Sequence, residues 1–197
     1  GQMTQVDLGV IAKGKICQLE EPRALDTAKL RIAFEKYHVG SVLNVGCGSG
    51  TIALDEWRTI IEQLQAANKN YTRLDIPVVY GIDAIHGANY IVGATLFPQP
   101  IGQAATWNPS LVEQLNAITA YETRAAGIPW NFSPVLDIGR QPLWSRFFET
   151  YGEDVLLSSE MGTAAVKGLQ GNNLNDAYQV AACMKHFLGY STPLSGH

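Results

Sequence analysis

The chain has 197 residues, of which 46% are apolar and 16% are charged, and its formal net charge is -4. This composition is typical of a globular protein with a sizeable core and argues against intrinsic disorder. There is no cluster of basic residues, so nucleic acid and anionic membranes are poor candidate partners, and the longest apolar runs are too short to span a bilayer.

Two helix–strand pairs are predicted in the first half of the chain. The first helix begins at Asp26, a favourable N-cap residue, and ends near Gly40, and the apolar run at 42–45 is the strand that follows. The second helix runs from about 55 to 68 and is followed by the strand "PVVYGI" at 77–82. The buried stripe of this second helix is expected to consist of Trp57, Ile60, Ile61 and Leu64.

Two further pairs are predicted in the second half. Asn108 and Pro109 begin the third helix, since Asn caps a helix and Pro at the first helical position forfeits no hydrogen bond. The next strand lies in "IPWNFSPVLDI" at 128–138, the fourth helix runs from 155 to 170, and the last strand is "QVAACMKHF" at 179–187. The inward-facing residues are expected to be Leu111, Leu115, Ile118 and Ala125 in the third helix and Leu157, Met161, Ala164 and Ala165 in the fourth.

Alternating helices and strands predict an α/β fold with a parallel sheet. Two architectures fit four such units: an open doubly wound sheet, or the first half of a (β/α)8 TIM-type barrel. A complete barrel needs about 250 residues. A half barrel leaves two open parallel edges and an unfilled interior. We therefore expect residues 1–197 to be an incomplete fragment of a larger chain, with no internal domain boundary.

A glycine-rich run at 46–50, within "VLNVGCGSGT", raises a different possibility, an S-adenosylmethionine-dependent transferase. Such an enzyme needs an acidic residue at the end of the next strand to bind the ribose. Asp83 stands there, but it lies 83 − 50 = 33 positions after Gly50, against about 20 in a compact dinucleotide-binding unit. Asn44 also replaces the acidic residue usual before the first glycine. A tight strand-to-helix turn is the favoured interpretation.

Charged side chains gather in the long segments after the predicted strands. They are Asp83 and His86 after the second strand, Arg146 and Glu149 after the third, and Lys185 and His186 at the end of the fourth. Loops of more than about 15 residues are usually functional, and in a barrel the loops after the strands share one face. These residues are therefore expected to converge on one pocket.

Simpler interpretations of these residues stay open. Asp83 can merely cap a turn, and Arg146 can form a surface ion pair with Glu149 or Glu153. His86 is expected to form structural hydrogen bonds. Trp144 is the best candidate among the tryptophans for contact with a sugar ring. Lys185 and His186 follow an apolar run, where a charge is costly unless it has a partner, and this favours function.

Four motifs, in the family's order, resemble glycoside hydrolase family 3: "GIDAIHG" at 81–87, "GATLFPQPIGQAAT" at 93–106, "SRFFETYGED" at 145–154 and "KHFLGY" at 185–190. The resemblance implies the first half of that family's N-terminal (β/α)8-type barrel, with 42–51 as its first strand and turn. It also implies that Asp83, Arg146, Lys185 and His186 hold the hydroxyls of the non-reducing-end sugar. Glu149 would orient Lys185 or Arg146, and Trp144 and His86 would line the pocket.

The family's mechanism retains configuration and uses a carboxylate nucleophile and a carboxylic acid about 5–5.5 Å apart. In the family the nucleophile Asp lies in an "SDW"-like motif on a later strand, and the acid/base Glu comes from a second domain. Neither motif occurs in this chain, so both residues are expected beyond His197. The partners implied are the rest of the barrel, the second domain and an oligosaccharide substrate, and the fragment alone is expected to be inactive.

The last motif indicates which branch of the family, and so which class of sugar substrate, to expect. "KHFLGYSTPLSG" lacks the Pro and the second His of the "KHFPGHG" run found in N-acetylglucosaminidases, which favours the β-glucosidase branch. The sugar-binding set, if buried in a closed pocket, would fix one ring and exclude longer chains, which is exo-action. A β-xylosidase and a non-catalytic sugar-binding module are the alternatives. The loop "GRQPLWSR" departs from the family's commonest form at Gln141, Leu143 and Ser145.

No cofactor is implied. No metal site is expected from His86, His186 and His197, which lack close ligand spacing. Cys17, Cys47 and Cys183 are expected to be free thiols. The habit of the family suggests a periplasmic or secreted enzyme.

Overall fold

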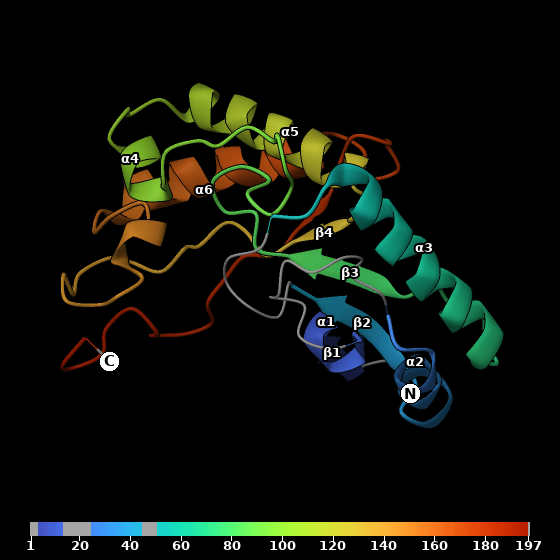
Figure 1. Ribbon diagram of the computed structural model, residues 1–197. Coiled ribbons are helices and arrows are strands. Elements are labelled where there is room, and N and C mark those ends of the chain that lie inside the picture. Colours follow the sequence, from blue (N-terminus) through green and yellow to red (C-terminus); the bar gives the residue numbers. More distant parts are fainter. Residues whose placement is uncertain (1–3, 14–24, 45–50, 197) are drawn as a thin grey trace. The chain divides into compact units, whose positions relative to one another are not determined.

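The structure is a computed structural model that describes residues 4–13, 25–44 and 51–196 (Figure 1). The glycine-rich run at 46–50, two of the three cysteines and His197 lie outside the described residues.

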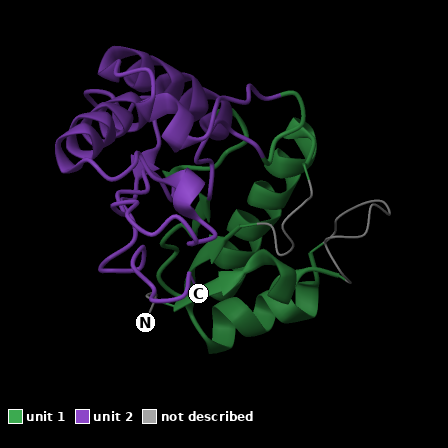
Figure 2. Ribbon diagram, turned by 90° about the vertical axis from the view of Figure 1, so that its left-hand side faces the viewer, with its two compact units in different colours: residues 1–82, 90–93, 125–130 green, residues 83–89, 94–124, 131–197 purple. Residues whose placement is uncertain are grey.

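The chain divides into two compact units, coloured separately in Figure 2. Unit 1 comprises residues 1–82, 90–93 and 125–130, and unit 2 comprises 83–89, 94–124 and 131–197. All the residues predicted to bind the sugar therefore belong to unit 2.

Five strands form one parallel sheet: β1 (Thr4–Asp7), β2 (Val39–Leu43), β3 (Val79–Ile82), β4 (Trp130–Asn131) and β5 (Ala181–Ala182). They lie in the sheet in chain order. A doubly wound sheet reverses its strand order at a switch point, whereas a (β/α)8 barrel keeps chain order. The α/β prediction and the barrel alternative are confirmed, and the doubly wound alternative is wrong. β1 was not predicted; it pairs with β2 through Gln5 and Ser41, Val6 and Val42, and Asp7 and Leu43.

The helices are α1 (Leu8–Ile11), α2 (Thr27–Arg31), a π-helix η1 (Ile32–Lys36), α3 (Leu54–Tyr71), α4 (Pro100–Ala104), α5 (Pro109–Ala125), a 3-10 helix η2 (Phe147–Glu149) and α6 (Val155–Gln170). Asp26 caps α2 as predicted, because its side chain accepts hydrogen bonds from the N–H groups of Ala28 and Lys29. The stop at Gly40 is wrong: the chain turns earlier at His38, whose φ is 51°, and Gly40 already belongs to β2. The short helices α1 and α4 were not predicted.

The core of unit 1 is built on α3 as its periodicity predicts. Trp57, Ile60 and Leu64 are buried, and Ile61 is half-buried. The Trp57 ring meets Tyr80 of β3 edge to face, with 5.5 Å between ring centroids, and its Nε1 donates to the Tyr90 carbonyl at 3.0 Å. Burial raises the pKa of the Tyr80 hydroxyl well above its ordinary value. The hydroxyl therefore stays neutral in the core.

The core of unit 2 lies between α5 and α6. Met161, Ala164 and Ala165 of α6 are buried as predicted, and Leu157 packs against the same cluster. The two helices come close at Gly168, where a Cβ would stand 2.2 Å from the Glu113 carbonyl oxygen. Only a residue without a side chain fits this crossing without a shift of backbone.

The buried face predicted for α5 is wrong in part. Leu115 is buried, but Leu111 and Ile118 are 43% and 44% exposed. The face that packs inward also contains polar residues, among them Asn116 and Thr119. Their side chains donate to the carbonyls one turn earlier, Asn116 to Val112 and Thr119 to Leu115, at 2.9 Å each. Because these donors are satisfied within the helix, polar residues can be buried where an apolar pattern assigns them to solvent.

No helix among the described residues is both long and apolar enough to cross a membrane.

Candidate active site

Asp83 follows β3 directly, and the backbone just after it is held by a buried side chain. Asn131, at the end of β4, accepts the N–H of Ala84 at 2.9 Å and donates to its carbonyl at 3.0 Å. The amide thus replaces a rung of the backbone ladder where strand pairing ends. Asn131 was not singled out in the sequence. Its only signal there was its place in a strand otherwise rich in apolar residues.

Parallel pairing beyond β5 brings Lys185 to Asp83. The Lys185 N–H donates to the Pro134 carbonyl at 3.1 Å, and the Lys185 carbonyl accepts from Leu136 at 2.7 Å. Its ammonium forms an ion pair with the Asp83 carboxylate. The two side chains are 14% and 26% exposed. Two residues predicted to bind the sugar, 102 positions apart in the chain, therefore meet at one place.

His186 is held by Asp137, a residue that the sequence analysis missed. Asp137 Oδ2 accepts both the His186 backbone N–H at 3.0 Å and its ring Nδ1 at 2.7 Å. The Asp137 side chain is 2% exposed, so its charge depends on these partners. The available signal was a lone carboxylate in the apolar run "SPVLDI", two residues past the point where the parallel strands pair.

Arg146 forms an ion pair with Glu149. Of the two partners proposed for the Glu149 carboxylate, Lys185 and Arg146, the structure shows Arg146. Arg146 Nε and Nη2 donate to the two carboxylate oxygens at 2.6 Å each, in the fork geometry that guanidinium and carboxylate share. Hydrogen bonding to Glu149 raises the pKa of Arg146 above its ordinary value, and the hydroxyl of Tyr190 adds to the rise. The side chains are 31% and 9% exposed. The pair is thus partly buried, unlike a simple surface ion pair.

Tyr190 connects the aromatic and cationic members of the site. Its ring meets His186 at 4.9 Å and Trp144 at 5.3 Å between centroids, both edge to face. The Arg146 guanidinium carbon lies 5.7 Å from the same ring centroid. Trp144 is itself buried, so it serves as a wall behind Tyr190. Tyr190 was also missed, although it lies inside the quoted motif "KHFLGY".

His86 is directed to the backbone of its own loop. Its Nδ1 lies 2.9 Å from the Phe97 carbonyl, and its carbonyl accepts the Phe97 N–H at 2.9 Å. The neighbouring Gly87 has a φ of 108°, and a Cβ there would stand 2.1 Å from the Thr95 carbonyl oxygen. These contacts match the structural hydrogen bonding considered for His86. They close the segment that follows Asp83.

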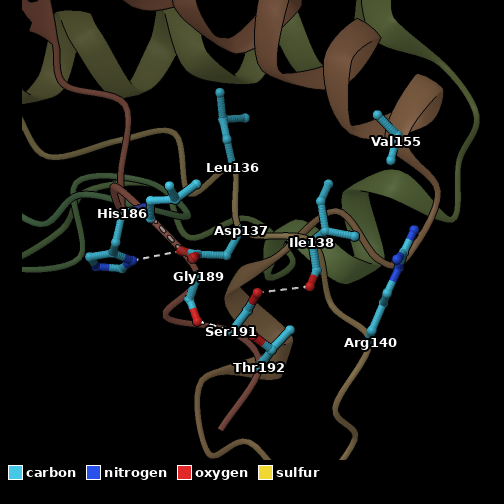
Figure 3. Close-up of a pocket in the computed structure, with 10 residues that line it drawn as sticks. Leu136, Asp137, Ile138, Arg140, Val155, His186, Gly189, Ser191 and Thr192 are labelled. Carbon is cyan, nitrogen blue, oxygen red and sulfur yellow. Dashed lines mark hydrogen bonds and ion pairs between the residues drawn. The ribbon is translucent and has the colours of Figure 1, made fainter.

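A hollow of about 390 Å³ lies beside the His186–Asp137 pair (Figure 3). Figure 3 shows the His186 ring turned toward the Asp137 carboxylate and Ser191 bonded to the Ile138 carbonyl. Arg140 lines the opposite side. Asp83, Lys185 and Arg146 are not among the described residues that line the hollow, so His186 is the member that it shares with the predicted sugar-binding set.

Metal binding finds no support in the part of the chain that the structure describes: no three or more His, Cys, Asp or Glu side chains are grouped so as to hold an ion. Cys183, the one cysteine within the described ranges, is a free thiol.

Residues 11–197 match the Glycosyl hydrolase family 3 N terminal domain. The chain belongs to glycosyl hydrolase family 3. The hydrolase family replaces the transferase alternative, which rested on the glycine-rich run alone.

The names of relatives within the family indicate different sugar substrates. The lysosomal beta glucosidase of Dictyostelium discoideum is 40% identical over 207 residues, covering 100% of this chain and 24% of that protein. A beta-xylosidase of Formosa agariphila is 39% identical over 146 residues, covering 71% of this chain and 20% of its own. A solved beta-glucosidase involved in saponin metabolism, from intestinal bacteria, is 36% identical with a TM-score of 0.74, covering 99% of this chain and 22% of its own. The chain spans about a quarter or less of the length of these relatives.

Proposed function

We propose that the protein carrying this family 3 chain is an exo-acting, retaining β-glucosidase that removes terminal non-reducing β-D-glucosyl residues from oligosaccharides. In this proposal Asp83, Arg146, Lys185 and His186 bind the terminal ring. The nucleophile Asp and the acid/base Glu are supplied by parts of the protein outside this chain. The observation that carries the proposal is the meeting of the Asp83–Lys185 pair with the His186–Asp137 pair, through adjacent residues of one strand end.

The chemistry of this group suits a sugar with vicinal hydroxyls. A carboxylate accepts two hydroxyl hydrogens, and ammonium and guanidinium groups donate to sugar oxygens in charge-assisted bonds. The donors and acceptors are already paired with one another, so they are held in place before a sugar arrives. Preorganised polar groups of this kind bind without a cost of reorganisation.

Exo-action follows from this arrangement if the rest of the protein closes the pocket around one ring. Retention of configuration rests on family membership, and so does the location of both catalytic carboxylates. A periplasmic or secreted location also stays a prediction.

A panel of aryl glycosides tests the substrate class on the full-length protein. Aryl β-glucoside is expected to be the best substrate, with β-anomeric product seen first by NMR. A preference for the β-xyloside would favour the second candidate, for which the similarity to the Formosa enzyme is the specific support. A preference for the N-acetylglucosaminide would overturn the β-glucosidase assignment.

The sugar-binding role is tested by Lys185→Met, which removes the ammonium that pairs with Asp83. A hydrogen bond from a charged group contributes about 1.5–3 kcal/mol, so kcat/KM for the aryl glucoside is expected to fall about 10- to 100-fold. Lys167→Met is the matched control, because Lys167 is an exposed lysine of α6 in the same unit. Equal activity of the two variants would contradict the assigned role.

The 197-residue chain alone is expected to hydrolyse no aryl β-glucoside, since the proposal places both catalytic carboxylates elsewhere. Turnover by the purified chain, at a rate that scales with its concentration, would refute that part of the proposal.

A further inference from the structure

We propose that Asp137 is a positioning residue that holds the His186 imidazole with its proton on Nδ1 and so presents Nε2 as the ring's sugar-binding atom. The identity of the bound sugar rests on the function proposed above. The choice of ring nitrogen does not, because it follows from contacts within this chain.

The first step is the double acceptance at one carboxylate oxygen. Asp137 Oδ2 receives the backbone N–H of His186 at 3.0 Å and ring Nδ1 at 2.7 Å. An ionised carboxylate has no hydrogen to donate. The hydrogen in the Nδ1–Oδ2 bond therefore belongs to the imidazole, and Nδ1 is the protonated nitrogen.

The second step is that the ring cannot easily turn over. A rotation of the ring by half a turn would exchange Nδ1 for a carbon, leaving the Asp137 carboxylate with the backbone N–H alone. That carboxylate is 2% exposed, and a buried charge that loses a partner is strongly destabilised. Tyr190 adds a steric limit, since its ring stands 4.9 Å from the imidazole at an interplanar angle of 74°.

The third step concerns what remains for a ligand. With Nδ1 engaged, Nε2 is the one ring nitrogen free of this bond. In the neutral ring Nε2 is an acceptor and takes the hydrogen of a sugar hydroxyl. His186 is 24% exposed and lines the hollow in Figure 3, so water and ligands reach it. Asp137 itself is shielded and acts through the ring.

The tautomer is tested by 15N NMR of the ring nitrogens in the 197-residue chain. The His186 signals are assigned as those lost in His186→Gln. The expected spectrum of the neutral ring shows a protonated Nδ1 and a bare Nε2. A protonated Nε2 with a bare Nδ1 would overturn the proposal, and this measurement requires neither activity nor an Asp137 variant that folds.

The functional consequence is tested by a double-mutant cycle in the full-length protein. Asp137→Leu keeps the approximate size of the side chain but has no acceptor, which removes the hydrogen bond that favours Nδ1–H. Asp137→Leu and His186→Gln are each expected to lower kcat/KM for the aryl β-glucoside about tenfold or more. The double variant is expected to be no worse than His186→Gln alone.

The outcomes separate the two proposals. Multiplied losses in the double variant would mean that Asp137 does not act through His186, and would overturn the positioning role. If the wild-type protein hydrolysed no glycoside, the proposed function would fail, while the NMR spectrum would still decide which ring nitrogen of His186 carries the proton.

Discussion

The replacement Glu149→Gln measures directly how much the Arg146–Glu149 ion pair contributes to the stability of this chain. Glu149 is the carboxylate that receives two hydrogen bonds of 2.6 Å from Arg146. The substitution keeps the size of the side chain but removes its charge and turns one acceptor into a donor. That donor faces a guanidinium that can only donate. Arg146 keeps its charge at every accessible pH, because its pKa is raised further by this pair.

The expected loss lies between two limits. Removing one partner of a fully buried ion pair costs about 3–5 kcal/mol, whereas exposed pairs contribute about 0–1 kcal/mol. Glu149 is close to the buried limit at 9% exposure, but Arg146 keeps 31% of its side-chain surface in water, which partly replaces the lost carboxylate. One acceptor oxygen also remains in Gln. We therefore expect a loss of about 2 kcal/mol in the free energy of unfolding.

The assay is urea unfolding of the 197-residue chain, followed by circular dichroism. Glu153→Gln is the control, since Glu153 is an exposed carboxylate in the same segment and was the alternative partner of Arg146. Its effect is expected to stay within about 0.5 kcal/mol. If Glu149→Gln and Glu153→Gln changed stability equally, the Arg146–Glu149 pair would be an ordinary surface contact. The argument that Glu149 holds Arg146 in position would then be wrong.

Three further predictions test the packing, the capping and the aromatic part of the site. Gly168→Ala places a methyl group 2.2 Å from the Glu113 carbonyl oxygen, which is too close without a shift of backbone. It should therefore destabilise the chain by about 1–3 kcal/mol in urea unfolding, despite the better helix propensity of Ala; a stabilised variant would contradict this close approach. The pKa of Asp26 is lowered below its ordinary 3.8, chiefly by its backbone hydrogen bond in the cap. Its ionised form is thus favoured by folding, and the stability it adds is present above that pH and is lost as the pH falls through the lowered pKa. Asp26→Asn still caps the helix, so an acid titration should cost it less stability than the wild type below about pH 4; parallel titration curves would argue against the capping role. In the full-length protein, Tyr190→Phe keeps the ring contacts and loses the hydroxyl beside Arg146, so KM should rise about twofold, whereas Tyr190→Ala should raise it about tenfold; equal effects would assign the contribution to the hydroxyl alone.

Local sequence signals located the long elements well because those signals are themselves local. The cap at Asp26 and the periodic apolar positions of α3 and α6 act over one or two turns, so all of the interacting residues lie close together in the sequence. α6 runs over Val155–Gln170, the predicted range, with Gly171 after its last residue at a φ of 53°.

The buried face of α5 was predicted wrongly in part because it depends on residues that are distant in the sequence. Its position depends on the crossing with α6, where Gly168 meets Glu113 across 55 residues of sequence. That crossing turns Thr119 inward and leaves Ile118 half exposed. β1 was missed because four residues of mixed polarity, "TQVD", form a strand only when β2 offers its edge.

The site shows the same division between local and distant information. Charged residues at strand ends were identifiable, because the ends of parallel strands share one edge. Their partners were not, because each pairing depends on strand register. Asp137 and His186 are 49 positions apart, and Asn131 and Ala84 are 47 apart. A shift by one residue would turn Asp137 to the other face of the sheet and remove both of its bonds to His186.

The charges of the site have a common arrangement that bears on the ligand. Each basic member is matched by a carboxylate of the same chain: Lys185 by Asp83, Arg146 by Glu149 and His186 by Asp137. Such a set carries little net charge but many oriented donors and acceptors. An anionic ligand would have to compete with the carboxylates already in place, whereas an uncharged polyol can insert its hydroxyls between partners without unbalancing any charge. The pairing therefore favours an uncharged, hydroxyl-rich ligand such as the sugar proposed above.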